Sequence, residues 1–326
     1  MGAVTGLSDA RLMGAALALA GRGRARSTPN PNVGCVLAKE GQIIGRGWTQ
    51  SGGRPHAEAM ALHQAGEAAK GATAYVTLEP CAHQSPRGPS CADSLIAAGI
   101  ARVVTALVDP DPRTHGTGIA RLRAAGIAVE AGLMADAAQR AMAGWLMQQA
   151  EGRPFVTLKL ATSLDGCIAM ADGESRWITG APARAHGHLE RARSNMILVG
   201  SGTIAADAPQ LDVRLPGLAA RSPARAVLTR GTAPQGWASL PAPEHIAGLA
   251  DVQYLLVEGG AAAAAAFLKA GLVDRLLLYR APILIGGGRP ALGDIGLAQL
   301  ADAHGQWQRV DARLLGKDQL EVYERA

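Results

Sequence analysis

A histidine, a glutamate and two cysteines form the pattern that most constrains this chain: His56-Ala-Glu58, then Pro80-Cys81, then Cys91. Structural zinc sites are closed by four protein ligands, whereas catalytic sites use three and leave the fourth position to water. Zinc lowers the pKa of that water to near neutrality, and Glu58 can pass its proton to departing ammonia. The pattern predicts a hydrolytic deaminase centre, with His56, Cys81 and Cys91 as zinc ligands and Glu58 as the catalytic residue.

The spacing of the two cysteines is unusual for such a centre. Nine residues separate Cys81 from Cys91, whereas the common deaminase pattern has two. The intervening segment 82–90 (AHQSPRGPS) is rich in Pro, Gly and Ser, so it can turn back and bring the thiols together. A purely structural zinc site is the alternative, but it would require a fourth protein ligand that the pattern does not supply.

The flanking sequence predicts how these ligands are presented. Residues 74–78 (AYVTL) favour a short buried strand that ends just before the first cysteine. Pro55 is suited to begin a helix, with His56 and Glu58 in its first turn. Cys91 would open a second helix, where the macrodipole lowers the thiol pKa and favours the thiolate that binds metal. Two helix N-termini would then converge on one ion.

Length and segment order predict two α/β domains. The chain has 326 residues, 48% of them hydrophobic, which is enough for two ordinary cores. We place the boundary at residues 151–154 (EGRP), giving domains 1–150 and 151–326. Strand-like and helix-like segments alternate in both, which indicates an α/β sandwich with a mostly parallel sheet in the first domain. The expected strands are 33–38, 74–78, 103–108, 128–131, 155–160, 196–199, 254–257, 276–279 and 283–288, and the expected helices include 12–20, 136–150 and 261–266.

Charge and cysteine content narrow the possible partners. The net charge is +5 with no dense Lys/Arg stripe, which argues against nucleic acid and suits a phosphorylated small molecule. No apolar stretch reaches membrane-spanning length, so no membrane association is expected. The four cysteines form no disulfide framework, which indicates a reducing, cytoplasmic location. His186-Gly-His188 is interpreted as a solvated helix face, because residues two apart on a helix point to different sides.

Five motifs occur in one order along nearly the whole chain. They are residues 28–34 (TPNPNVG), 56–58 (HAE), 77–83 (TLEPCAH), 159–166 (KLATSLDG) and 173–179 (GESRWIT). Together they resemble the bifunctional riboflavin-biosynthesis deaminase–reductases. The resemblance implies a cytidine-deaminase-like α/β/α domain followed by a dihydrofolate-reductase-like α/β domain. The first would use Zn2+ to deaminate 2,5-diamino-6-(phosphoribosylamino)pyrimidin-4-one, and the second would use NADPH to reduce the ribosyl group to ribityl.

The resemblance also implies roles for individual residues. In the deaminase domain, Asn30 and His83 would contact the pyrimidine and Arg87 would reach the phosphate. The reductase substrate would be held by Lys159, Ser175, Arg191, Leu211, Arg214 and Glu258. NADPH would be bound by Ala161, Trp177, Thr203, Asp207 and Gly260. We also expect a homo-oligomer.

Three features depart from the family pattern. The loop between Cys81 and Cys91 is one residue longer, which bears on the role of Arg87. The segment 206–209 (ADAP) has one carboxylate fewer than the family's Ala-Asp-Asp-Pro. The stretch around 215–250 is short and rich in Ala, Pro and Gly, as if a strand-helix portion of the reductase sheet were missing. One alternative is therefore a deaminase with a degenerate reductase domain. Another is a nucleobase deaminase or RNA-binding zinc protein, suggested by the +4 charge of residues 1–150.

Overall fold

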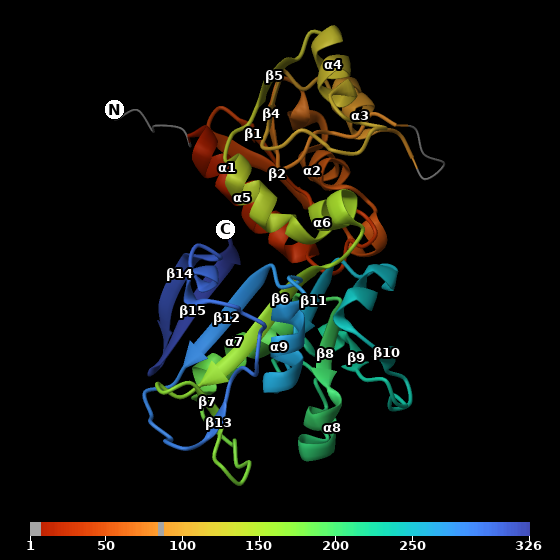
Figure 1. Ribbon diagram of the computed structural model, residues 1–326. Coiled ribbons are helices and arrows are strands. Elements are labelled where there is room, and N and C mark those ends of the chain that lie inside the picture. The colour runs from red at the N-terminus through yellow and green to blue at the C-terminus, as the bar shows by residue number, and fades with distance from the viewer. Residues whose placement is uncertain (1–7, 84–87) are drawn as a thin grey trace, which may run out of the picture. The chain divides into compact units, whose positions relative to one another are not determined.

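Separate sheets organise the two halves of the chain (Figure 1). The computed structural model describes residues 8–83 and 88–326, and within them a five-stranded sheet forms in the first half and an eight-stranded sheet in the second. The chain divides into two compact units, Met1–Gly152 and Arg153–Ala326. No helix in the described ranges is long and apolar enough to cross a membrane.

The first unit carries a mixed sheet, ordered β2-β1-β3-β4-β5. β3, β4 and β5 run parallel, but β1 pairs antiparallel with both β2 and β3. The prediction of a mostly parallel sheet is therefore wrong, because the glycines at 45 and 47 interrupt the apolar pattern of β2 and hide it. The elements in chain order are α1 (Asp9–Gly23), β1 (Gly34–Lys39), β2 (Gln42–Trp48), α2 (Ala57–Ala65), β3 (Thr73–Val76), α3 (Cys91–Ala97), β4 (Arg102–Thr105), α4 (Thr117–Ala124), β5 (Ala128–Ala131), α5 (Ala135–Ala141) and α6 (Ala143–Glu151).

Helices cover both faces of this sheet, as the predicted sandwich requires. A Cβ built on Gly34 would lie 1.9 Å from the carbonyl oxygen of Ala16 in α1. One built on Gly47 would lie 2.0 Å from that of Ala57 in α2. Cys35, not Gly34, is the strand partner of Gly47, so the two glycines face opposite sides of the sheet. Glycine is thus needed at both positions for the helices to approach the strands closely.

The second unit has the strand order β10-β9-β8-β11-β6-β12-β15-β14. The strands from β10 to β12 are parallel, and β15 and β14 add an antiparallel edge. The elements are β6 (Phe155–Thr162), β7 (Cys167–Ala169), α7 (Ala181–Ala192), β8 (Met196–Gly200), α8 (Ser201–Asp207), β9 (Ala224–Leu228), β10 (Ala238–Leu240), β11 (Tyr254–Val257), α9 (Ala261–Lys269), β12 (Arg275–Arg280), β13 (Arg289–Pro290), β14 (Trp307–Leu315) and β15 (Asp318–Arg325).

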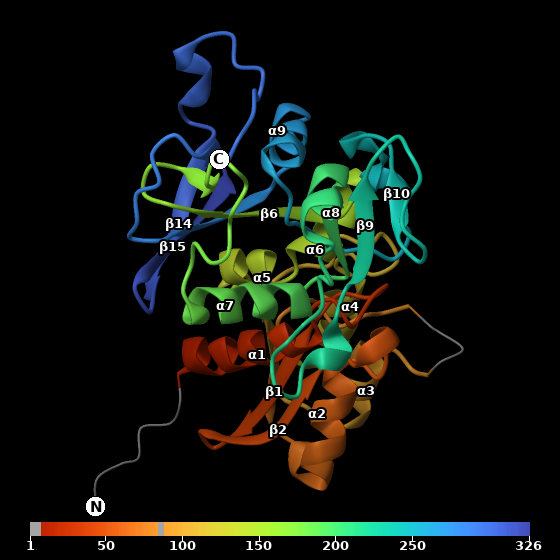
Figure 2. The ribbon, with the colours of Figure 1, turned by 90° about the horizontal axis from the view of Figure 1, so that it is seen from below.

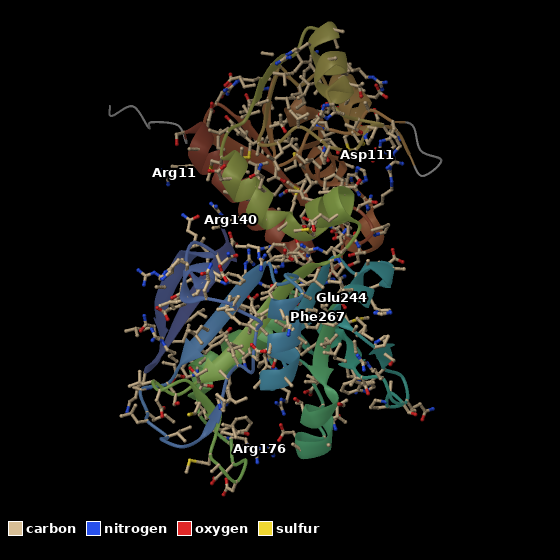
Figure 3. All side chains as sticks on the ribbon, in the orientation of Figure 1. Arg11, Asp111, Arg140, Arg176, Glu244 and Phe267 are labelled. Atoms are coloured by element: carbon tan, nitrogen blue, oxygen red, sulfur yellow. The ribbon has the colours of Figure 1, made fainter. Side chains whose placement is uncertain are left out.

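Two helices cover opposite faces of this sheet near its centre. Phe267 of α9 packs in the core that contains Leu158 of β6 (Figure 3). Ala183 of α7 packs against Leu277 and Tyr279 of β12. Figure 2 shows β6 running between α7 and α9. The parallel strands therefore end in a region bounded by helices on both sides.

Three predicted elements differ from the structure. Residues 283–288 form a loop rather than a strand, and Asp165 accepts hydrogen bonds there from the N–H groups of Ile285 (3.2 Å) and Gly286 (2.7 Å). The predicted helix 136–150 is divided into α5 and α6 at Met142. The short stretch around 215–250 keeps two sheet strands, β9 and β10, and only 3₁₀ turns connect the strands there.

Candidate active sites

Three metal-binding side chains of the first unit meet at one point. The ligand atoms of His56, Cys81 and Cys91 all lie within 4.8 Å of one another. His56 Nδ1 is 3.2 Å from Cys91 Sγ and 3.7 Å from Cys81 Sγ. Ligand atoms about 3.6 Å apart are expected around a tetrahedral zinc ion with Zn–N and Zn–S bonds of ordinary length. The donor set therefore fits one zinc ion with a fourth position for water.

Helix ends present two of these ligands. Cys91 is the first residue of α3, where Ser90 caps the helix by accepting from the N–H of Asp93. His56 is the N-cap of α2 and not, as predicted, a residue of its first turn. The reason is that the Pro55 carbonyl closes the preceding turn by accepting from the N–H of Gln50 (3.0 Å).

The surroundings of the two thiols favour one thiolate before any metal binds. Hydrogen bonding from the Cys91 thiol, reinforced by His56, lowers the pKa of Cys81 to about 4. The backbone N–H of Cys91 also points to Cys81 Sγ, at 3.3 Å. The same contact, together with burial, raises the pKa of Cys91. A thiolate is the form that binds zinc.

Glu58 lies in the first turn of α2, next to these three side chains. It is only 3% exposed, and this burial raises the pKa of its carboxyl group. Its side chain also contacts the Cys91 thiol. A buried carboxyl group with a raised pKa beside a metal site is suited to accept and return a proton.

Of the residues expected to contact the pyrimidine, Asn30 contacts this cluster, and His83 follows Cys81 by two residues. Asn30 Nδ2 is 3.1 Å from His56 Nε2 and donates to the carbonyl of Gly53 (2.9 Å). His83 is half-buried, with Nδ1 3.3 Å from the hydroxyl of Thr114. Arg87 lies outside the described residues.

Sequence reasoning missed the structural role of Glu79, the residue before Pro80-Cys81. Its buried carboxylate accepts hydrogen bonds from three backbone N–H groups, those of Asp109 (3.1 Å), Gly116 (2.9 Å) and Ile119 (3.0 Å). These groups belong to the loop after β4, marked by Asp111 in Figure 3, and to the start of α4. Glu79 therefore fixes that loop to the strand end that carries Cys81. A lone Glu before Pro-Cys gives no signal for this in the sequence.

The second unit contains a cleft of about 600 Å³. All but one of the residues assigned to the reductase line it, namely Lys159, Ala161, Ser175, Trp177, Arg191, Thr203, Asp207, Arg214, Glu258 and Gly260. The exception is Leu211, which is 5% exposed and packs in an apolar cluster with Ile197, Val199 and Leu256.

A charged network crosses the floor of this cleft. Arg191 of α7 makes two hydrogen bonds of 2.8 Å to the carboxylate of Glu258, at the end of β11. Lys159 Nζ of β6 is 3.9 Å from the same carboxylate. Burial alone would raise the pKa of Glu258, but Arg191 and the charge of Lys159 lower it. Glu258 is therefore an anion held between two cations.

The Gly259-Gly260 turn leads from β11 into α9. A Cβ on Gly259 would lie 2.7 Å from Cβ of Ala263, so a larger residue would push the turn away from the helix. The N–H of Gly260 donates to the hydroxyl of Thr203 (3.2 Å). Trp177 is 64% exposed and stacks on the guanidinium of Arg184 at 4.6 Å. Arg176, labelled in Figure 3, marks the loop that carries Trp177.

The two histidines of α7 are not a solvated face, so that interpretation is wrong. His186 Nδ1 is 2.7 Å from the hydroxyl of Tyr279, and its Nε2 is 3.0 Å from Arg313. His188 Nδ1 is 3.1 Å from the carbonyl of Asp212. Both rings lie between α7 and other segments of the unit. The charged residues that neighbour them in the sequence suggested a solvent-exposed face instead.

Family models match both units. Residues 7–107 match the cytidine and deoxycytidylate deaminase zinc-binding region, and residues 154–238 and 246–319 match the RibD C-terminal domain. The riboflavin biosynthesis protein RibD of Escherichia coli K12 is 42% identical, over 96% of this chain and 98% of that protein. The chain belongs to the RibD family of riboflavin-biosynthesis proteins. The RibD of Mycobacterium tuberculosis H37Rv is 40% identical over 90% of each chain.

Solved RibD structures have the same fold. Form 1 of Acinetobacter baumannii RibD has a TM-score of 0.87 at 38% identity, covering 98% of this chain and 99% of its own. A diaminohydroxyphosphoribosylaminopyrimidine deaminase/5-amino-6-(5-phosphoribosylamino)uracil reductase from Thermotoga maritima has a TM-score of 0.88 at 29% identity, with the same coverage. The predicted fold class is confirmed: a cytidine-deaminase-like domain precedes a dihydrofolate-reductase-like domain. The chain is a bifunctional riboflavin-biosynthesis deaminase and reductase, and its reductase domain implies a nicotinamide cofactor.

Proposed function

We propose that this RibD-family enzyme catalyses two consecutive reactions on one pyrimidine. The first unit removes the 2-amino group of 2,5-diamino-6-(phosphoribosylamino)pyrimidin-4-one by hydrolysis, and the second reduces the ribosyl group to ribityl with NADPH. The observation that carries the proposal is a three-ligand His-Cys-Cys set beside the buried carboxyl group of Glu58. The name of the Thermotoga maritima relative, which states both reactions, supports the same pair of substrates.

In the deaminase unit, His56, Cys81 and Cys91 would hold Zn2+, which would supply a Lewis acid and a water of lowered pKa. Glu58 would accept a proton from the attacking water and donate it to the 2-amino group, so that a C2–O bond forms and the C2–N bond breaks with release of ammonia. Burial raises the pKa of this carboxyl group, which favours its role as a proton acceptor and donor. Asn30 and His83 orient the ring, and Arg87 meets the phosphate.

In the reductase unit, NADPH supplies the hydride that converts ribosyl to ribityl. We assign its binding to Ala161, Trp177, Thr203, Asp207 and Gly260. The exposed face of Trp177 suits stacking, and the turn at Gly260 opens α9, whose N-terminus attracts phosphate. The substrate contacts Lys159, Ser175, Arg191, Arg214 and Glu258, which line the cleft, whereas Leu211 packs in an apolar cluster and has no contact role in this proposal. The two cations held by Glu258 attract an anionic substrate without introducing an unpaired charge.

The role of Glu58 gives the sharpest test of the deaminase. Glu58→Gln keeps the size of the side chain but removes its ability to take a proton. We expect ammonia release to fall by about 10²- to 10⁴-fold while zinc content stays unchanged. Glu67→Gln, on an exposed turn of the same unit, is the matched control and should retain full activity. Undiminished ammonia release by Glu58→Gln protein would contradict the mechanism.

We also propose that the enzyme is a homo-oligomer. β14 is an edge strand that pairs only with β15 among the described strands. Leu314 on it is 73% exposed and Val310 41% exposed. Exposed edge strands of this kind pair readily with another chain. Sedimentation equilibrium should give a mass at least twice that of one chain, and a monomer at assay concentrations would contradict this.

A further inference from the structure

Arg54, two residues before His56, is a cation with no ion-pair or hydrogen-bond partner for its guanidinium among residues 8–83 and 88–326. Its Nε is buried without a hydrogen-bond partner. No ion pair within 4.0 Å involves Arg54 among residues 8–83 and 88–326. Its Nη nitrogens also make no hydrogen bond to the described residues, and they are reachable by solvent. An anionic ligand would supply this guanidinium with the counter-charge that the described residues do not give.

The backbone on both sides of Arg54 is fixed by hydrogen bonds. The carbonyl of Gly53 accepts from Asn30 Nδ2 (2.9 Å), and Asn30 in turn contacts the ring of His56. A Cβ on Gly53 would lie 2.7 Å from Cγ of Asn30, so the two residues are in close contact. On the other side, the Pro55 carbonyl accepts from the N–H of Gln50. The starting point of the Arg54 side chain is thus preorganised relative to a metal ligand.

The Arg54 guanidinium reaches the chain segment that precedes Cys91. Arg54 Nη1 is 3.8 Å from where a Cβ on Gly88 would lie. Gly88 is three residues before Cys91. Arg54 therefore spans the two chain segments that supply His56 and Cys91, and an anion bound there is held beside both.

We infer that Arg54 binds the phosphate of the deaminase substrate and selects phosphorylated over unphosphorylated pyrimidine ribosides. The inference rests on the proposed function, since the phosphate belongs to that substrate. A guanidinium pairs with phosphate oxygens through parallel charged hydrogen bonds, and its geometry suits this better than an ammonium does. Arg54 is a specificity-determining residue additional to Arg87.

The experiment compares two substrates that differ only in the phosphate. Arg54→Ala should lower kcat/KM for the phosphorylated diaminopyrimidine by about 10- to 100-fold and leave kcat/KM for the dephosphorylated compound unchanged. Arg54→Lys should recover part of the loss. Arg11→Ala removes one exposed charge from α1 (Figure 3) and should change neither value. Equal losses on both substrates, or no loss on either, would overturn the inference.

A titration without turnover separates this inference from the proposed function. Ribose 5-phosphate serves as the probe, and calorimetry measures its dissociation constant on zinc-loaded protein. The Kd of Arg54→Ala protein should be about 10- to 100-fold higher than that of wild-type protein. Equal Kd values would overturn the role of Arg54 even if ammonia release follows the proposed function. Wild-type protein that binds the probe more tightly than Arg54→Ala protein but releases no ammonia would contradict the proposed function alone.

Discussion

The two active sites are held together by different kinds of contact. In the deaminase unit, hydrogen bonds from the main chain fix the site. Glu79 accepts from three backbone N–H groups, and Cys81 Sγ accepts from the N–H of Cys91. In the reductase unit, ion pairs between side chains fix the site, with Glu258 paired to Arg191 and close to Lys159. The first site therefore depends on local folding around one ion, and the second on charge balance between distant segments.

This difference predicts that damage to one site spares the other. The ligands of the first unit lie within one stretch of about 35 residues, whereas the network of the second joins residues about 100 positions apart. The largest losses of activity should come from removing a residue of the His-Cys-Cys cluster or of the charged network around Glu258. Weakening the hydrogen bonds that support the cluster should have a smaller effect, and changing the protonation of a carboxyl group the smallest.

Loss of a zinc ligand should have the largest effect. Cys91→Ser removes one of three protein ligands, and a site with two does not retain zinc well. We expect ammonia release to fall by about 10³-fold or more, with the loss of bound zinc measured by atomic absorption. Reduction of the already deaminated pyrimidine should be unchanged. Cys167→Ser, in the second unit, is the control and should keep its zinc; normal ammonia release by Cys91→Ser would contradict the assignment.

Breaking the reductase network should have the next largest effect. Arg191→Ala leaves the buried carboxylate of Glu258 without its bidentate partner, which costs about 3–5 kcal/mol for a buried pair. We expect reduction to fall by about 10²-fold and the urea midpoint of the second unit to decrease. Ammonia release should persist at the wild-type rate. An unchanged rate of reduction in Arg191→Ala protein would show that charge balance does not stabilise this site.

Weakening the support of the zinc site should have a moderate effect. Glu79→Gln keeps the shape but removes the negative charge that attracts three backbone N–H groups. Supporting contacts of this kind affect metal sites by about 10- to 100-fold when removed entirely, so we expect a loss of ammonia release near the lower value. Amide hydrogen exchange at Gly116 and Ile119 should become faster. Exchange that stays as slow as in the wild type would show that Glu79 does not fix the loop.

One carboxyl group in each unit should make stability depend on pH, and the two dependences should have opposite signs. Burial raises the pKa of Asp109, in the first unit, from 3.8 to about 6. Its folded form binds more protons than its unfolded form, so its stabilising contribution is complete below about pH 3.8 and is lost as pH rises to about 6. The pKa of Glu258 is lowered below 4.5, so its contribution is present above that pH and is lost as pH falls.

Urea denaturation between pH 4 and 7 checks the sign for Asp109. Asp109→Asn should remove the decline in the stability of the first unit between about pH 4 and 6, and should make that unit more stable than wild type at pH 7. The carbonyl of the new amide still accepts from the N–H of Asp111. An unchanged pH dependence in the variant would contradict the raised pKa of Asp109.

The sequence was sufficient to predict the parts that are local. The meeting of His56, Cys81 and Cys91, the strand ending before Cys81 and the helix opening at Cys91 follow from short motifs with strong spacing constraints. β2 was missed because Gly45 and Gly47, which let α2 approach the sheet, also erase the alternation of a strand. The loop at 283–288 was mistaken for a strand because its apolar residues suggested burial, whereas Asp165 fixes its backbone instead.

Contacts between distant residues were not predictable from one sequence. Nothing near Glu79 or Arg54 indicates which backbone groups or segments they will meet. The resemblance named Arg191 and Glu258 but not the bidentate pair between them. Leu211, named by the same resemblance, is buried in an apolar cluster, and its side chain does not line the cleft.

Coupled turnover tests the central claim, two working sites on one chain, most directly. Zinc-loaded protein is mixed with the diaminopyrimidine substrate and NADPH, and ammonia and NADPH are followed together. We predict that ammonia is released first and that NADPH is then oxidised in equal amount, while ammonia release continues when NADPH is omitted. Ammonia release with no NADPH oxidation would contradict the account by showing that the second site does not work.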